Sequence, residues 1–150
     1  MATEEIVEGM LRSITDWAIA RDDIFAAALV GSWAKGTARS DSDIDVMFVV
    51  CDPLQLRLER SWSAEIDWPS LYRIDRQMVK DYGVVWSRHL SLSDSEGSGN
   101  VLVELSFGSS DWVAFNPVDP GTKRVVSDGM RVLYEQDHLL SDLIDAVGEG

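Results

Sequence analysis

The sequence predicts an α/β or α+β domain in which a mixed β-sheet is flanked by helices. Two observations lead to this class. In the first third of the chain, segments with the 3.6-residue period of helices alternate with short apolar runs typical of strands. Later, a turn-rich segment separates two more strand-like runs, which is the pattern of an antiparallel hairpin. The length of 150 residues is that of one compact domain, so we expect residues 1–150 to form a single unit.

The elements of the first third follow from periodicity and from helix and strand breakers. Apolar residues recur at three- and four-residue spacing from Ile6 to Ala18, after a potential cap at Thr3. The apolar run 24–30 predicts a strand that ends at Gly31. We then expect a short helix over 32–37 and a second strand over 44–51, which Pro53 ends.

The middle and the end of the chain give weaker patterns. The alternation of leucines at 54, 56 and 58 suits a strand, whereas the polar residues between them suit a helix. Ser70 is predicted to cap a helix that carries Leu71, Ile74 and Met78. The hairpin strands are expected over 83–92 and 101–107, with the turn over 93–100. A short helix around 125–126, a strand over 130–134 and a helix that follows Asp137 and closes at Gly148 complete the prediction.

The charge of the chain excludes some functions. Thirteen Lys and Arg oppose 26 Asp and Glu, which gives a formal net charge of −13. Such a surface repels a phosphate backbone, so we expect no nucleic-acid partner. It attracts cations, or it serves only solubility. Cys51 is the only cysteine, and no leader-like or membrane-spanning apolar run is present, so a cytoplasmic location is expected.

Two aspartates interrupt the start of the second strand. Asp43 and Asp45 flank Ile44, so the strand period of two directs both carboxylates to one face. At about 5 Å and an effective dielectric of 20, two such charges repel by roughly 3 kcal/mol. A divalent cation reverses the sign of this interaction. Carboxylate ligands without a His or Cys cluster favour Mg²⁺, or Mn²⁺ as an alternative.

A turn that could hold phosphate precedes the aspartates. Gly31 allows a sharp backbone turn, and the hydroxyl of Ser32 together with free amide groups could hold an anion. Lys35 and Arg39 add positive charge nearby, although each could also be an ordinary surface residue. Ser32 could equally be only a helix cap. The G-x-x-x-x-G-K pattern of a Walker loop is absent.

The stretch GSWAKGTARSDSDIDV resembles the signature of the DNA polymerase β-like nucleotidyltransferase superfamily. It is similar to the motif of aminoglycoside-type adenylyltransferases and of minimal nucleotidyltransferase antitoxins, with Lys35 at a position where arginine is usual. The resemblance implies a nucleotidyltransferase fold and a two-metal transfer of a nucleoside monophosphate. AMP from ATP is the expected donor group, and a hydroxyl is the expected acceptor.

The resemblance also implies a third carboxylate on a later strand. Glu104 in VLVELSFG is the preferred candidate, because a glutamate within such an apolar run is costly unless it is paired or metal-bound. Asp67 is the competitor and Asp111 is less favoured. His89 and His138 have no partners at the spacing of a metal site, so a surface or capping role is expected for both and neither is expected to bind a metal.

These residues define a main hypothesis and a rival. In the main hypothesis the catalytic and metal-binding residues are Asp43, Asp45 and Glu104. The nucleotide-binding residues are Gly31, Ser32, Lys35 and Arg39. The rival is a nucleotidyltransferase-fold module that binds a nucleotide or a partner protein without catalysis. The acceptor could be an antibiotic, a protein or a metabolite, and a homodimer or a partner protein could complete its site.

Overall fold

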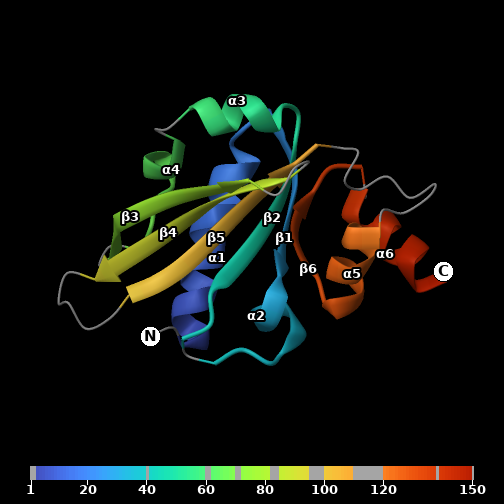
Figure 1. Ribbon diagram of the computed structural model, residues 1–150, viewed down its shortest axis with the longest axis horizontal. Helices are drawn as coiled ribbons and strands as arrows, with labels where there is room; N and C mark the ends of the chain where they lie inside the picture. The colour runs from blue at the N-terminus through green and yellow to red at the C-terminus, as the bar shows by residue number, and fades with distance from the viewer. Residues whose placement is uncertain are drawn as a thin grey trace.

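The computed structural model describes residues 3–39, 41–59, 62–69, 72–81, 85–94, 100–109, 120–137 and 139–149. The helices are α1 (Glu4–Ile19), α2 (Gly31–Lys35), α3 (Pro53–Leu58), α4 (Trp62–Glu65), α5 (Pro120–Asp128) and α6 (Leu139–Glu149). The strands are β1 (Ile24–Val30), β2 (Ile44–Val50), β3 (Tyr72–Asp81), β4 (Trp86–Asp94), β5 (Asn100–Gly108) and β6 (Arg131–Glu135). The mixed sheet and the helices that flank it confirm the predicted α/β or α+β fold class (Figure 1).

The six strands form one sheet in the order β3-β4-β5-β2-β1-β6. Strand β2 pairs with β5 in parallel, and every other neighbouring pair is antiparallel. The sheet is therefore mixed, and its one parallel pair lies at its centre. Strands β4 and β5 form the predicted antiparallel hairpin.

The first face of the sheet is covered by α1, which lies behind the strands in Figure 1. The side chain of Thr3 accepts a hydrogen bond from the amide of Ile6, so the predicted cap of α1 is confirmed. The core beneath α1 contains a cluster of stacked and edge-on aromatic rings, formed by Trp17, Phe48, Trp62, Trp86 and Phe107. This packing holds β2 and β5 rigidly against each other.

The second face is covered over only part of the sheet. Residues of α5 and α6, among them Val126, Leu140 and Leu143, pack on Ala26, Ala28 and Val49 of β1 and β2. The side chains of β3, β4 and β5 on this face belong to neither core cluster. Figure 1 shows α5 and α6 beside β6, away from β3 and β4. Among the described residues, the second face is thus open beside the centre of the sheet.

Two predictions for the middle and the end of the chain are wrong. The segment that was expected to be a helix with Ile74 and Met78 is the edge strand β3, while Ser70 and Leu71 lie outside the described residues. Pairing with β4 overrides the helical spacing, and a register shift between Ile74 and Arg76 hides the alternation of the strand. At the end, α6 runs through Gly148 to Glu149.

Other boundaries differ by a few residues, and the alternating leucines from 54 to 58 belong to α3. Helix α2 starts one residue before its predicted range, and Ser93 and Asp94 extend β4 into the predicted turn. The rest of that turn, over 95–99, lies outside the described residues. No helix in the described part of the chain combines the length and the apolar character needed to cross a bilayer.

Candidate active site

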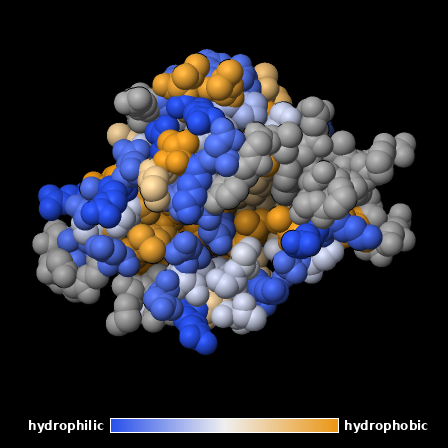
Figure 2. Space-filling model, viewed as in Figure 1, coloured by the Kyte–Doolittle hydropathy of each residue, from blue (hydrophilic) through white to orange (hydrophobic). Residues whose placement is uncertain are grey.

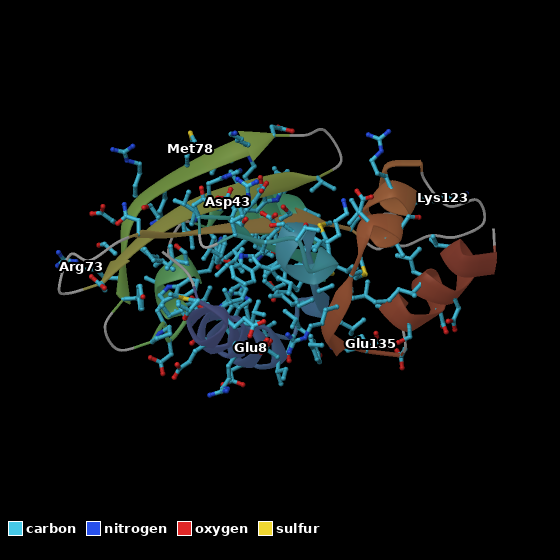
Figure 3. All side chains as sticks on the ribbon, turned by 90° about the horizontal axis from the view of Figure 1, so that it is seen from below. Glu8, Asp43, Arg73, Met78, Lys123 and Glu135 are labelled. Carbon is cyan, nitrogen blue, oxygen red and sulfur yellow. The ribbon has the colours of Figure 1, made fainter. Side chains whose placement is uncertain are left out.

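Three carboxylates converge on the second face of the sheet. Asp43 directly precedes β2, Asp45 is its second residue, and the parallel register places Asp45 opposite Glu104 of β5. Ligand oxygens of the three side chains all lie within 4.8 Å of one another, and each residue is half-buried. Figure 3 shows Asp43 on the side of the sheet opposite Glu8 of α1. The three residues form one candidate site, which we call the carboxylate cluster.

Gly31 makes room for the cluster. It begins α2 with φ +73°, a conformation that costs other L-residues free energy. A Cβ atom at this position would overlap Oδ2 of Asp45 and would lie 3.3 Å from its Cγ. The glycine therefore allows the chain to turn directly against the Asp45 carboxylate. The close approach that the structure shows is to Asp45, and the approach of this backbone to a phosphate stays a prediction.

Burial and mutual repulsion disfavour the charged forms of these carboxylates. Burial, the hydrogen bond with Glu104 and the charges of Glu104 and Asp43 raise the pKa of Asp45 to about 8. Burial and the charge of Glu104 also raise the pKa of Asp43, whereas His89 and Lys80 act in the opposite direction. The cluster without a cation therefore holds a proton near neutral pH.

The cluster fits a divalent cation. Oδ1 of Asp45 is buried without a hydrogen-bond partner among the described residues, which is costly for a carboxylate oxygen. A hard cation would satisfy this oxygen and remove the repulsion among the three side chains. The donors are all carboxylate oxygens, the ligand type that Mg²⁺ and Mn²⁺ prefer.

His89 belongs to the surroundings of the cluster, which the sequence reasoning missed. The β4–β5 register places His89 opposite Glu104, with Nε2 at 3.3 Å from Oε1 of Glu104 and 3.2 Å from Oγ of Ser87. The expected surface or capping role of His89 did not include this contact with Glu104. In the sequence, His89 alternates with two serines, Ser87 and Ser91. This pattern could have placed His89 on the same face of the sheet as Glu104. His138 lies outside the described residues.

The other predicted site residues lie in α2 or in the segment that follows it. Ser32 is the second residue of α2, its hydroxyl has no hydrogen bond among the described residues, and Val30 holds the cap position instead. Lys35 ends α2 and points to Asp128, with 3.9 Å between Nζ and Oδ1. Arg39 is exposed in a turn where its amide donates to Oγ of Ser42.

Asp67, the competitor for the third carboxylate that the structure describes, is not in the cluster. Asp67 lines a depression next to α1, together with Arg12 and Trp17. Asp111 lies outside the described residues. Of the described carboxylates proposed for this position, Glu104 is the one that the fold brings to Asp43 and Asp45.

Comparison with known families agrees with this geometry. The profile of the family described as "Nucleotidyltransferase domain" matches residues 16–85, which include Gly31, Asp43 and Asp45. Residues 16–85 are therefore similar to that family. The match ends before Glu104, so the assignment of Glu104 to the carboxylate cluster rests on the β2–β5 register. No curated protein sequence matches the chain.

Solved structures with a similar chain trace were also found. Three of them are JHP933 from Helicobacter pylori (12% identity, TM-score 0.46), a candidate nucleotidyltransferase from the same organism (12%, 0.48) and an aminoglycoside 6-adenyltransferase from Bacillus subtilis (12%, 0.46). The alignments cover 85%, 85% and 75% of the present chain, and 57%, 58% and 37% of those chains. The chain thus spans less than two thirds of the length of each. Its acidic triad is typical of metal-dependent nucleotidyltransferases.

Proposed function

We propose that the domain transfers a nucleoside monophosphate, AMP from ATP, to a hydroxyl group in a Mg²⁺-dependent reaction. The observation that carries this proposal is the convergence of Asp43, Asp45 and Glu104 within 4.8 Å on an open face of the sheet. Half-buried carboxylates at this spacing destabilise one another, so a structural role alone does not explain them. The family match supports the reaction class, while the base and the acceptor are our proposal.

The residues take distinct roles in this proposal. Asp43 and Asp45 would hold the cations that accompany the triphosphate, and Glu104 would hold the cation that activates the acceptor. Bound Mg²⁺ would stabilise the negative charge that develops on the attacking and leaving oxygens. Ser32 and backbone amides next to Gly31 hold the phosphates. Lys35 and Arg39 add positive charge at the rim of the nucleotide site.

The bond changes of the transfer balance without a further reactant. The acceptor oxygen forms a bond to the α-phosphorus, and the bond from that phosphorus to the oxygen of the β-phosphate breaks. The hydroxyl proton passes to Glu104, and pyrophosphate leaves on the opposite side. An in-line displacement of this kind needs the acceptor and the leaving group on opposite sides of the α-phosphate.

Release of pyrophosphate from Mg²⁺-ATP by the purified chain tests the proposal. We expect release to depend on Mg²⁺ or Mn²⁺ and to be lost in Asp43→Asn and Asp45→Asn. Asp67→Asn is the matched control, because it removes a carboxylate outside the cluster, and its activity should equal that of the parent. Water and a panel of hydroxyl compounds serve as acceptors.

The rival function predicts a different result from the same measurements. A non-catalytic module would bind Mg²⁺-ATP, as measured by calorimetry, but would release no pyrophosphate with any acceptor. Full activity in the two asparagine variants would contradict metal-dependent catalysis by the carboxylate cluster.

A further inference from the structure

A groove borders the carboxylate cluster on the open part of the second face. It has a volume of about 180 Å³ and is formed by β3, β4 and β5 together with Asp43. Met78 and Leu102, which are 54% and 45% exposed, supply much of its apolar surface. Figure 2 shows apolar patches among hydrophilic side chains over this part of the sheet. We call this feature the β3–β5 groove.

The β3–β5 groove lies on the side of the cluster away from Gly31. The strand registers give one row across the sheet, in which Val30, Asp45, Glu104, His89 and Met78 follow one another. Gly31 follows Val30 at one end of this row, and the groove wall formed by Met78 is at the other end. If the phosphates lie on the Gly31 side, an in-line attack comes from the groove side.

The charge in the β3–β5 groove is positive apart from the cluster itself. Asp43 is the one carboxylate among the described lining residues, and in the proposed function it faces a cation. Arg76 lines the groove and makes no ion pair with the other described residues. Lys80 follows two residues after Met78 on the same strand, and its charge acts on Asp43. In a chain of net charge −13, such a local excess of positive charge favours an anion.

The size of the β3–β5 groove limits the ligand. A protein cavity of about 150 Å³ holds one benzene ring, so the groove accommodates a ring or a short alkyl chain with a few further atoms. The side chains of Met78 and Leu102 can contact such an apolar body. A polycationic acceptor would find no carboxylate besides Asp43 among the described groove residues.

We propose that the β3–β5 groove binds the acceptor, and that this acceptor is a small hydroxy acid whose apolar body contacts Met78 and Leu102 and whose anionic group pairs with Arg76. The part that concerns transfer rests on the proposed function, whereas the binding part stands on the groove alone. The acceptor hydroxyl would then lie next to Asp43 and Glu104, where Glu104 can take its proton.

Two probes with the same phenol and two-carbon linker but opposite charge test the binding part. They are 3-(4-hydroxyphenyl)propionate and tyramine, which share a phenol and differ in the terminal group. Carbon-13 NMR of methionine methyl groups follows their binding to the full chain with Mg²⁺, since Met78 lines the groove and Met10 of α1 is fully buried. We expect the propionate to shift the Met78 signal, to leave Met10 unchanged, and to bind at least about tenfold more tightly than tyramine.

Substitutions on β3 assign the charge preference to one residue. Arg76→Gln should reduce propionate affinity about tenfold and leave tyramine affinity unchanged, and Arg76→Glu should reverse the preference. Arg73→Gln is the matched control, because Arg73 is exposed on the same strand but outside the groove, far from Asp43 in Figure 3. Tighter binding of tyramine, no shift of Met78 with either probe, or equal effects of Arg73→Gln and Arg76→Gln would overturn the proposal.

Transfer to the probes separates this proposal from the proposed function. With Mg²⁺-ATP, we expect faster pyrophosphate release with the propionate than with tyramine, and Arg76→Gln should raise KM for the propionate without changing nucleotide affinity. A loss of nucleotide affinity in Arg76→Gln would assign the groove to the nucleotide and overturn the acceptor role. Release with water that neither probe increases would also overturn it, while leaving nucleotidyl transfer intact. No release under any condition would contradict the proposed function, and the Met78 shifts would still decide the binding part.

Discussion

Replacing Asp45 by asparagine is expected to stabilise the metal-free protein at neutral and alkaline pH. Burial and the neighbouring carboxylates raise the pKa of Asp45 from 3.8 to about 8. The unfolded chain restores the ordinary value, so between these two pH values folding takes up a proton. The contribution of Asp45 to the free energy of unfolding is therefore highest below the ordinary pKa, and it falls as the pH rises through the window from 3.8 to about 8.

The size of this fall follows from the width of the window. One pKa unit corresponds to about 1.4 kcal/mol, so the range from pH 5 to pH 8 gives an upper limit of roughly 4 kcal/mol. The cluster is only half-buried, and solvent screening reduces the effect, so we expect about 2 kcal/mol. Asparagine keeps the shape of Asp45 and a hydrogen-bond donor toward Glu104, but it has no proton to lose in this range.

Urea unfolding in EDTA at pH 5 and pH 8 measures the difference between the parent and Asp45→Asn. Asp75→Asn is the control, because it removes the same formal charge from the exposed part of β3 and should keep the pH dependence of the parent. Mg²⁺ in place of EDTA should stabilise the parent at pH 8 and should stabilise Asp45→Asn much less. An equal fall in stability for the parent and Asp45→Asn between the two pH values would refute the reasoning.

Three further predictions concern the remaining residues of the site. Gly31→Ala should lose Mg²⁺ affinity in calorimetry, because its Cβ overlaps the Asp45 carboxylate. Gly36→Ala, at φ +80° but in open space, should keep Mg²⁺ binding and lose about 1 kcal/mol of stability in urea unfolding. Ser32→Ala should weaken ATP binding by about 1–2 kcal/mol in calorimetry, and unchanged affinity would place the phosphates elsewhere. Glu104→Gln should keep ATP affinity but reduce pyrophosphate release about a hundredfold or more, and full activity would remove Glu104 from the chemistry.

The sequence was sufficient to predict the strands β1 and β2 and the placement of the paired aspartates on one face. The apolar run around Ile44 can be buried only if one face of β2 is apolar, and this places Asp43 and Asp45 together on the other face. Glu104 followed the same rule within β5. Its position opposite Asp45 needed the register between two distant strands, which the family resemblance supplied and local periodicity could not.

The features that the sequence analysis missed or assigned wrongly have one physical origin. They are determined by pairing between strands, that is, by residues close in space but not in sequence. His89 faces Glu104 only because of the register of the β4–β5 hairpin, and the eight-residue turn expected from the sequence did not define that register. The apolar residues of β3 have a helical spacing, and a register shift after Ile74 interrupts the alternation of the strand. Pairing with β4 decides its conformation, and local sequence patterns do not contain that information.

The parallel pairing of β2 with β5 has a consequence for the rates of folding and unfolding. Between these two strands the chain forms α3, α4, β3 and β4, so the contact between Asp45 and Glu104 closes a long loop. Contacts of large sequence separation are costly in loop entropy and tend to form late in folding. A cation that needs all three carboxylates would then bind the native state much better than the transition state. Mg²⁺ would slow unfolding and leave the refolding rate nearly unchanged, so the loaded domain would gain lifetime but would not fold faster.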